Sequence, residues 1–261
     1  MRTFILGEPP FAGSGEGVRI AVIDSGVNAT NPHVGAVAGG VGIADDGSFH
    51  DDLVDRVGHG TAVVAAIQEK APAAAIHVVR VFETSLTTRS ENLVRAIDWA
   101  AGNGMHLANL SLGTANPDRA AILGDAVDRA REAGLLVVSA LEHRGARWWP
   151  GSAPGAVGVI ADESCGRDEL RVESGPDADQ ATDANTDPAH VFKILPASRQ
   201  LIVRASPLPR PIPGVPPQRN VRGTSFAVAN ASGFLARGLA SAGDAGAPGA
   251  SPERLWRSLR D

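Results

Sequence analysis

The chain has 261 residues, of which 43% are hydrophobic, and its formal net charge is −5. This length and apolar content suit one domain with a full core, so we expect residues 1–261 to form a single domain. Because Lys and Arg form no block, the sequence argues against nucleic acid or an anionic membrane as a partner. The lone Cys165 excludes an internal disulfide, and its polar neighbours favour an exposed thiol.

Residues 1–17 are expected to be an N-terminal extension that precedes the first strand. Their longest apolar run covers residues 4–6, which is too short for the core of a signal peptide. No other stretch approaches the apolar length of a membrane span. We therefore expect a cytoplasmic protein.

Two polar residues stand where regular elements begin or end. A β-branched run at residues 18–24 predicts a buried strand that ends at Asp24. His59 lies between two glycines and opens an apolar helix, so something is expected to approach the backbone there closely. Taken singly, Asp24 fits a turn residue that closes a strand, and His59 fits a capping or packing residue.

The remaining elements alternate between strand and helix. Strands are expected at 77–82, 107–112, 135–140 and 156–161, and helices at 90–102 and 117–133. This alternation predicts an α/β fold with a mostly parallel central sheet and helices on both faces.

Two segments lack the apolar periodicity of regular elements. The acidic segment 162–190 is predicted to be a mobile loop, because it offers little apolar surface to bury. The proline-rich segment 207–217 fits either a rigid connection or an extended recognition motif.

A Gly-Thr-Ser turn at 223–225 leads directly into a helix of small residues. The first turn of a helix has unpaired N–H groups and a positive dipole end, so negative charge that develops on Ser225 would be stabilised. This is a suitable position for a nucleophile. The same residues would also serve as an ordinary helix cap.

Asp24, His59 and Ser225 follow one another in the chain order that subtilisin uses for its catalytic residues. The blocks 22–26, 58–61 and 223–227 resemble the Asp, His and Ser motifs of the subtilisin-like serine peptidase family, and the likeness extends over about residues 18–242. The resemblance implies a catalytic triad of Asp24, His59 and Ser225 in a serine endopeptidase that works through an acyl-enzyme. No cofactor is expected.

The resemblance also implies a polypeptide substrate bound as an extended strand along Ser111, Leu112, Gly113 and Thr114. A pocket is expected between this segment and the one that follows residue 140. Trp148 and Trp149 could narrow or floor that pocket, or could belong to the core or to a protein contact.

The family usually supplies an Asn side chain as its second oxyanion donor, and this chain has His143 in the matching stretch. His143 is expected to be a substitute donor. Two alternatives remain at this point. Catalysis could be weakened, or the local alignment could be shifted so that backbone amides donate to the oxyanion instead.

No metal site is expected. The segment 68–76 is too short and has too few carboxylates for the calcium loop that the family usually carries there. Asp45, Asp46, Asp51 and Asp52 could bind a cation elsewhere, but clustered carboxylates fit a solvated face.

The short extension before the first strand leads us to expect an intracellular processing protease that acts on a particular polypeptide. Two alternatives use the same fold. One is a peptide-binding protein that has lost turnover, and the other is a peptide ligase or esterase that uses the same triad.

Overall fold

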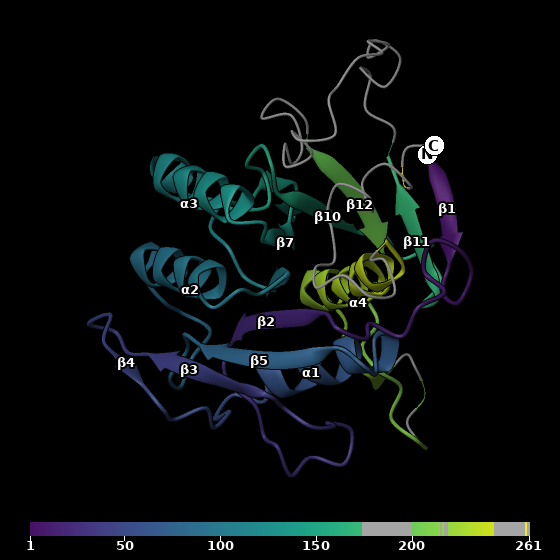
Figure 1. The fold of residues 1–261 in the computed structure, drawn as a ribbon, viewed down its shortest axis with the longest axis horizontal. Helices are drawn as coiled ribbons and strands as arrows, with labels where there is room; N and C mark the ends of the chain where they lie inside the picture. The colour runs from purple at the N-terminus through teal and green to yellow at the C-terminus, as the bar shows by residue number, and fades with distance from the viewer. Residues whose placement is uncertain (174–199, 215, 217–218, 243–258, 260–261) are drawn as a thin grey trace.

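The computed structural model describes residues 1–173, 200–214, 216, 219–242 and 259 (Figure 1). The helices are α1 (His59–Lys70), α2 (Ser90–Gly102), α3 (Ala120–Glu132), α4 (Thr224–Ala242) and the short 3-10 helix η1 (Pro117–Arg119). The strands are β1 (Arg2–Ile5), β2 (Arg19–Asp24), β3 (Gly39–Ile43), β4 (Phe49–His50), β5 (Ala75–Arg80), β6 (Leu107–Leu110), β7 (Leu136–Ala140), β8 (Glu142–His143), β9 (Ala146–Arg147), β10 (Val157–Ala161), β11 (Glu169–Val172) and β12 (Leu201–Ala205).

Ten of these strands form one sheet in the order β1-β11-β12-β10-β7-β6-β2-β5-β3-β4. The seven strands from β12 to β3 in this order are parallel, and the pairs β1–β11, β11–β12 and β3–β4 are antiparallel. The prediction of a mostly parallel sheet is confirmed.

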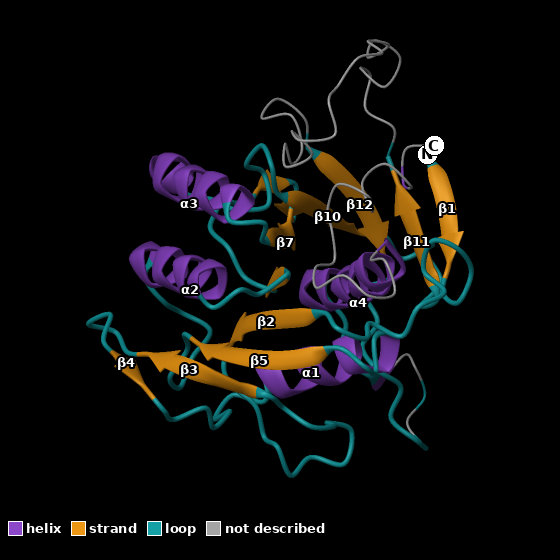
Figure 2. Ribbon diagram, in the orientation of Figure 1, coloured by secondary structure: helices purple, strands orange, loops and turns teal. Residues whose placement is uncertain are grey.

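The central strands are buried on both faces, which is why they are apolar throughout. In β2, Ile20 and Val22 belong to one core cluster, whereas Ala21 and Ile23 belong to another. The first cluster contains buried residues of α1 and α4, and the second contains those of α2 and α3 (Figure 2). Helices therefore cover both faces, as predicted.

The start of α1 lies directly against the turn that follows β2. A Cβ at Gly60 would be 2.3 Å from the carbonyl oxygen of Gly26, so only glycine permits this approach. Gly58 has φ 88°, a left-handed conformation that glycine adopts without strain. The close backbone approach expected at His59 is thus provided by the turn after Asp24.

The N-terminal extension and the acidic loop that the sequence predicts both contain strands, so these predictions are wrong in part. Within residues 1–17, β1 pairs with β11, and within residues 162–190, β11 pairs with β1 and β12. Leu170 and Val172 of β11 are buried. Pairing with two neighbouring strands stabilises β11, although its run of apolar residues is too short to predict a strand. Residues 174–190 lie outside the described part of the chain.

Cys165 is buried, not exposed. Burial raises the pKa of its thiol to about 11, so the thiol is inert at neutral pH.

The proline-rich segment is tied to the start of α4. The N–H of Gly223 donates to the carbonyl of Pro207, and the side-chain amide of Asn230 donates to the carbonyl of Leu208. These contacts favour the rigid connection over the recognition motif.

Among the helices that the structure describes, none combines the length and apolarity needed to cross a lipid bilayer.

Candidate active site

The candidate residues meet because three neighbouring parallel strands end at the same edge of the sheet. In the order β7-β6-β2, the strand β2 ends at Asp24, Ser111 follows β6, and Leu141 follows β7. His59 and Ser225 are added at the first turns of α1 and α4. This edge, at the carboxyl ends of the strands, is where α/β proteins place their ligands.

Asp24 and His59 form a short contact. The Nδ1 of His59 lies 2.7 Å from Oδ1 of Asp24, whose side chain is fully buried. Burial alone would lower the pKa of His59, but the hydrogen bond that His59 donates to Asp24 and the charges of Asp24 and Asp55 outweigh it and raise this pKa above 6.5. The contact leaves Nε2 of His59 available for proton transfer.

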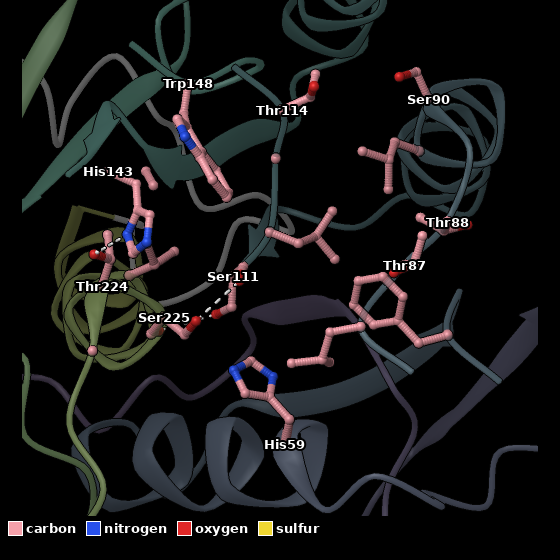
Figure 3. A pocket seen from close by; sticks show the side chains of 18 residues that line it. His59, Thr87, Thr88, Ser90, Ser111, Thr114, His143, Trp148, Thr224 and Ser225 are labelled. Carbon is pink, nitrogen blue, oxygen red and sulfur yellow. Dashed lines mark hydrogen bonds between the residues drawn. The ribbon is translucent and has the colours of Figure 1, made fainter. Parts of the chain in front are cut away.

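Ser225 lies with His59 on the wall of one cavity of about 420 Å³ (Figure 3). Its hydroxyl donates to the carbonyl of Ser111 at 3.1 Å, and the hydroxyl of Ser111 donates to the carbonyl of Ser225 at 3.0 Å. The hydroxyl of Ser225 must therefore turn away from Ser111 before it can give its proton to His59. Such contacts often tighten only when substrate binds.

Asp55 supports the His59 side of the site, and the sequence analysis missed it. Its carboxylate accepts hydrogen bonds from the hydroxyl of Ser25 at 2.9 Å, from the N–H of Gly58 at 2.7 Å and from the N–H of Thr61 at 2.8 Å. Burial alone would raise the pKa of Asp55, but the hydrogen bonds from Thr61, Gly58 and Ser25 hold it below 3.8. Asp55 thus ties the turn after Asp24 to the first turn of α1.

Replacing Asp55 with Ala is expected to lower the free energy of unfolding by about 1–3 kcal/mol at pH 7, because several buried donors lose their acceptor. Since the pKa of Asp55 is lowered in the folded state, its stabilisation is present above pH 3.8 and is lost as the pH falls below that value. Urea unfolding at pH 7 and at about pH 3 measures both effects. An equal difference between the two proteins at both pH values would contradict this role.

His143 lies on the opposite side of the cavity from His59 (Figure 3). It belongs to the β8–β9 hairpin, whose two turn residues Arg144 and Gly145 have φ 54° and φ 78°, as a tight two-residue hairpin requires. Its Nδ1 lies 3.1 Å from Oγ1 of Thr224, a cavity residue that the sequence analysis did not single out. A neutral His143 that accepts this bond would carry its proton on Nε2.

The expected substrate-binding segment lines the same cavity, with one correction. The N–H and C=O of Thr114 already pair with the C=O and N–H of Trp149, both at 2.9 Å, and the carbonyl of Leu112 accepts from Ser139. Successive residues of an extended segment point their backbone groups to opposite sides. The backbone groups of Ser111 and Gly113 therefore face the cleft, and those of Thr114 do not.

Two of the four acidic residues near 45–52 have partners of their own, and Asp46 accepts a hydrogen bond from the N–H of Ser48 at 2.9 Å. Asp52 forms ion pairs with Arg56 at 2.8 Å and with Arg80 at 3.2 Å. In the described ranges of the chain, no group of three or more His, Cys, Asp or Glu side chains is placed to hold a metal ion.

Comparison of the sequence with known protein families identifies the family of this chain. The model of the subtilase family matches residues 15–164, which is more than half of the chain. The chain belongs to the subtilase family. This match includes Asp24, His59 and His143, and it ends before Ser225.

Two curated subtilases illustrate the degree of similarity. Subtilisin Savinase of Lederbergia lenta is 35% identical over 142 residues, which are 51% of this chain and 50% of that protein. A thermostable alkaline protease of Halalkalibacterium halodurans is 31% identical over 174 residues, which are 62% of this chain and 46% of that protein. The chain thus spans about half the length of the curated subtilases it matches.

Two solved structures share the subtilase fold over most of the chain. A cold-adapted subtilisin-like serine proteinase has a TM-score of 0.64 at 23% identity and covers 93% of this chain and 81% of its own. A lanthipeptide protease has a TM-score of 0.65 at 19% identity and covers 94% of this chain and 80% of its own. At these identities the likeness describes the fold alone.

Proposed function

We propose that this subtilase is a serine endopeptidase that cleaves peptide bonds through an acyl-enzyme, with Asp24, His59 and Ser225 as its catalytic residues. One observation carries the proposal: a buried carboxylate holds Nδ1 of His59 at 2.7 Å, while His59 and Ser225 line one cavity. This combination supplies an oriented base beside a hydroxyl at a helix N-terminus.

In the proposed reaction, the hydroxyl of Ser225 turns from Ser111 to His59 and gives its proton to Nε2 as its oxygen attacks the substrate carbonyl. Asp24 holds the ring in the required tautomer and stabilises its charged form. His59 then gives the proton to the leaving amine. Water attacks the acyl-enzyme with His59 as base, and the proton returns to Ser225 when the acid product leaves.

Two hydrogen-bond donors would stabilise the oxyanion, the negatively charged oxygen that forms when Ser225 attacks the substrate carbonyl. The N–H of Ser225, the second residue of α4, has no carbonyl partner inside the helix. We propose the Nε2–H of His143 as the other donor, with Thr224 holding Nδ1 at 3.1 Å and thereby selecting the tautomer.

Replacing His143 with Ala is expected to lower kcat by about 10²–10³-fold with little change in KM, because the donor acts on charge that develops in the transition state. Steady-state kinetics on one peptide measures the effect. His143→Asn is the matched control, and it is expected to keep more activity than Ala since its amide also donates. Wild-type kcat in His143→Ala would contradict the role.

The substrate is proposed to be a polypeptide that pairs as an extended strand with Ser111 and Gly113, whose backbone groups face the cleft. We further propose that the enzyme acts inside the cell and processes a particular polypeptide. The support for selectivity is that Thr114, which lines the cavity, is already joined to Trp149 by two hydrogen bonds, so part of this wall is fixed before a substrate binds. Cell fractionation tests whether the enzyme acts inside the cell. Identification of trapped substrates tests whether it processes a particular polypeptide.

Digestion of a defined peptide mixture, followed by mass spectrometry, tests the proposed activity. We expect hydrolysis products from the wild-type chain and none from Ser225→Ala. Products joined to added amines instead of hydrolysed would indicate a ligase.

A peptide-binding protein without turnover is the second candidate, favoured by the hydrogen bond that turns the hydroxyl of Ser225 toward Ser111. It would bind peptides while Ser225 fails to react with a fluorophosphonate.

A further inference from the structure

We infer that Trp148 limits the residue that supplies the cleaved carbonyl to a small side chain, so the substrates are polypeptides cleaved after Gly, Ala or Ser. This inference rests on the proposed function and adds the chemistry of the substrate at the bond that is cut. It is carried by three observations: where Trp148 lies, how closely it approaches the opposite wall, and how firmly it is held.

Trp148 lies in the cavity between its two walls. One wall is the segment from Ser111 to Thr114, and the other begins at Ala140 and includes His143. Figure 3 shows Trp148 between His143 and Thr114, with its ring pointing toward Ser111. A carbonyl attacked by Ser225 belongs to a residue held between these walls, so its side chain must enter the space beside Trp148.

The space beside Gly113 is already filled. A Cβ at Gly113 would lie 2.9 Å from Cε3 of Trp148 and 2.6 Å from the carbonyl oxygen of Trp149. A methyl group on Gly113 itself would therefore collide, which means that Gly113 and the indole are in direct contact and that no substrate side chain fits between them. The cavity keeps open volume elsewhere, beside apolar residues that include Phe82, Leu93 and Leu112.

The indole cannot easily move aside. The backbone N–H of Trp148 donates to the carbonyl of Leu141 at 2.9 Å, and the backbone carbonyl of Trp148 accepts from the N–H of Ser152 at 2.8 Å, so the main chain that carries the indole is held in place. Its ring packs on the ring of His143 at 5.1 Å between centroids. Trp149 packs against the core and is bridged to Thr114. A large substrate side chain would have to displace the indole from its contacts with His143 and Gly113 before it could bind.

Competition kinetics tests the inference with peptide libraries that have one fixed residue, Ala or Phe, before the cleaved bond and random residues elsewhere. One or a few methylene groups in a pocket change kcat/KM by about 10–200-fold, so we expect about 100-fold preference for Ala over Phe. Trp148→Ala is expected to abolish most of this preference by raising kcat/KM for Phe. Trp99→Ala, which removes an indole from α2 outside the cavity, is the matched control and should keep the preference.

A second measurement separates this inference from the proposed function. Calorimetric titration of Ser225→Ala with peptides that end in Ala or Phe reports binding without turnover. We expect the Ala peptides to bind at least about 10-fold more tightly, and the double variant Trp148→Ala/Ser225→Ala to lose this difference. Equal binding of both peptides to Ser225→Ala, an unchanged preference after Trp148→Ala, or no binding to either variant overturns the inference. Absence of hydrolysis with selective binding would overturn only the proposed function.

Discussion

Replacing Ser225 with Ala is expected to lower kcat by about 10⁶-fold, because the nucleophile is lost and the rest of the triad has no substitute for it. Steady-state hydrolysis of a peptide measures the loss. KM should change little, since the backbone groups of Ser111 and Gly113, the proposed partners of the substrate strand, are retained. Circular dichroism checks that the variant folds.

Members of a triad act as a unit, which provides a control for the Ser225 result. His59→Ala/Ser225→Ala should be no slower than Ser225→Ala alone, because neither residue contributes without the other. If the losses of the two single variants instead multiply in the double variant, Ser225 and His59 act independently and the proposed mechanism is wrong.

Replacing Asp24 with Asn is expected to lower kcat by about 10⁴-fold, because the amide favours the wrong tautomer of His59. The pH profile should change as well. Asp24 helps to raise the pKa of His59 above 6.5, and His59 must be neutral to accept the proton, so wild-type activity is lost as the pH falls through this raised value. In Asp24→Asn the acid limb of kcat/KM should move to lower pH.

Peptide hydrolysis measured between about pH 5 and pH 9 gives both the rate and the position of this limb. Asp55→Ala is a useful comparison, since it removes a smaller contribution to the pKa of His59 and keeps the Asp24 carboxylate itself. An acid limb that stays in the same place in Asp24→Asn would contradict the coupling of Asp24 to His59.

The sequence was enough to predict the central strands and the three motif residues. Each of these signals is local: a β-branched run ending at Asp24, and glycine turns that open the helices of His59 and Ser225. The alternation of strand and helix then implied a parallel sheet whose carboxyl edge gathers such residues.

What the sequence did not reveal depends on contacts between distant residues. Asp55 is a loop residue whose partners include Ser25, thirty positions earlier, so its position in the chain gives no signal. The closeness of Trp148 to Gly113 depends on how two loops are bridged at Thr114 and Trp149. Likewise, β3 begins with Gly39 and Gly40, residues with no apolar side chain from which a strand could be predicted.

The most direct measurement of the proposed triad is the rate at which a fluorophosphonate reacts with the chain as the pH is varied, with the modified residue mapped by mass spectrometry. We predict a single adduct on Ser225, formed at a rate that rises with pH through an apparent pKa above 6.5. An adduct on another residue, or a rate on Ser225 that does not depend on the protonation of His59, would contradict it.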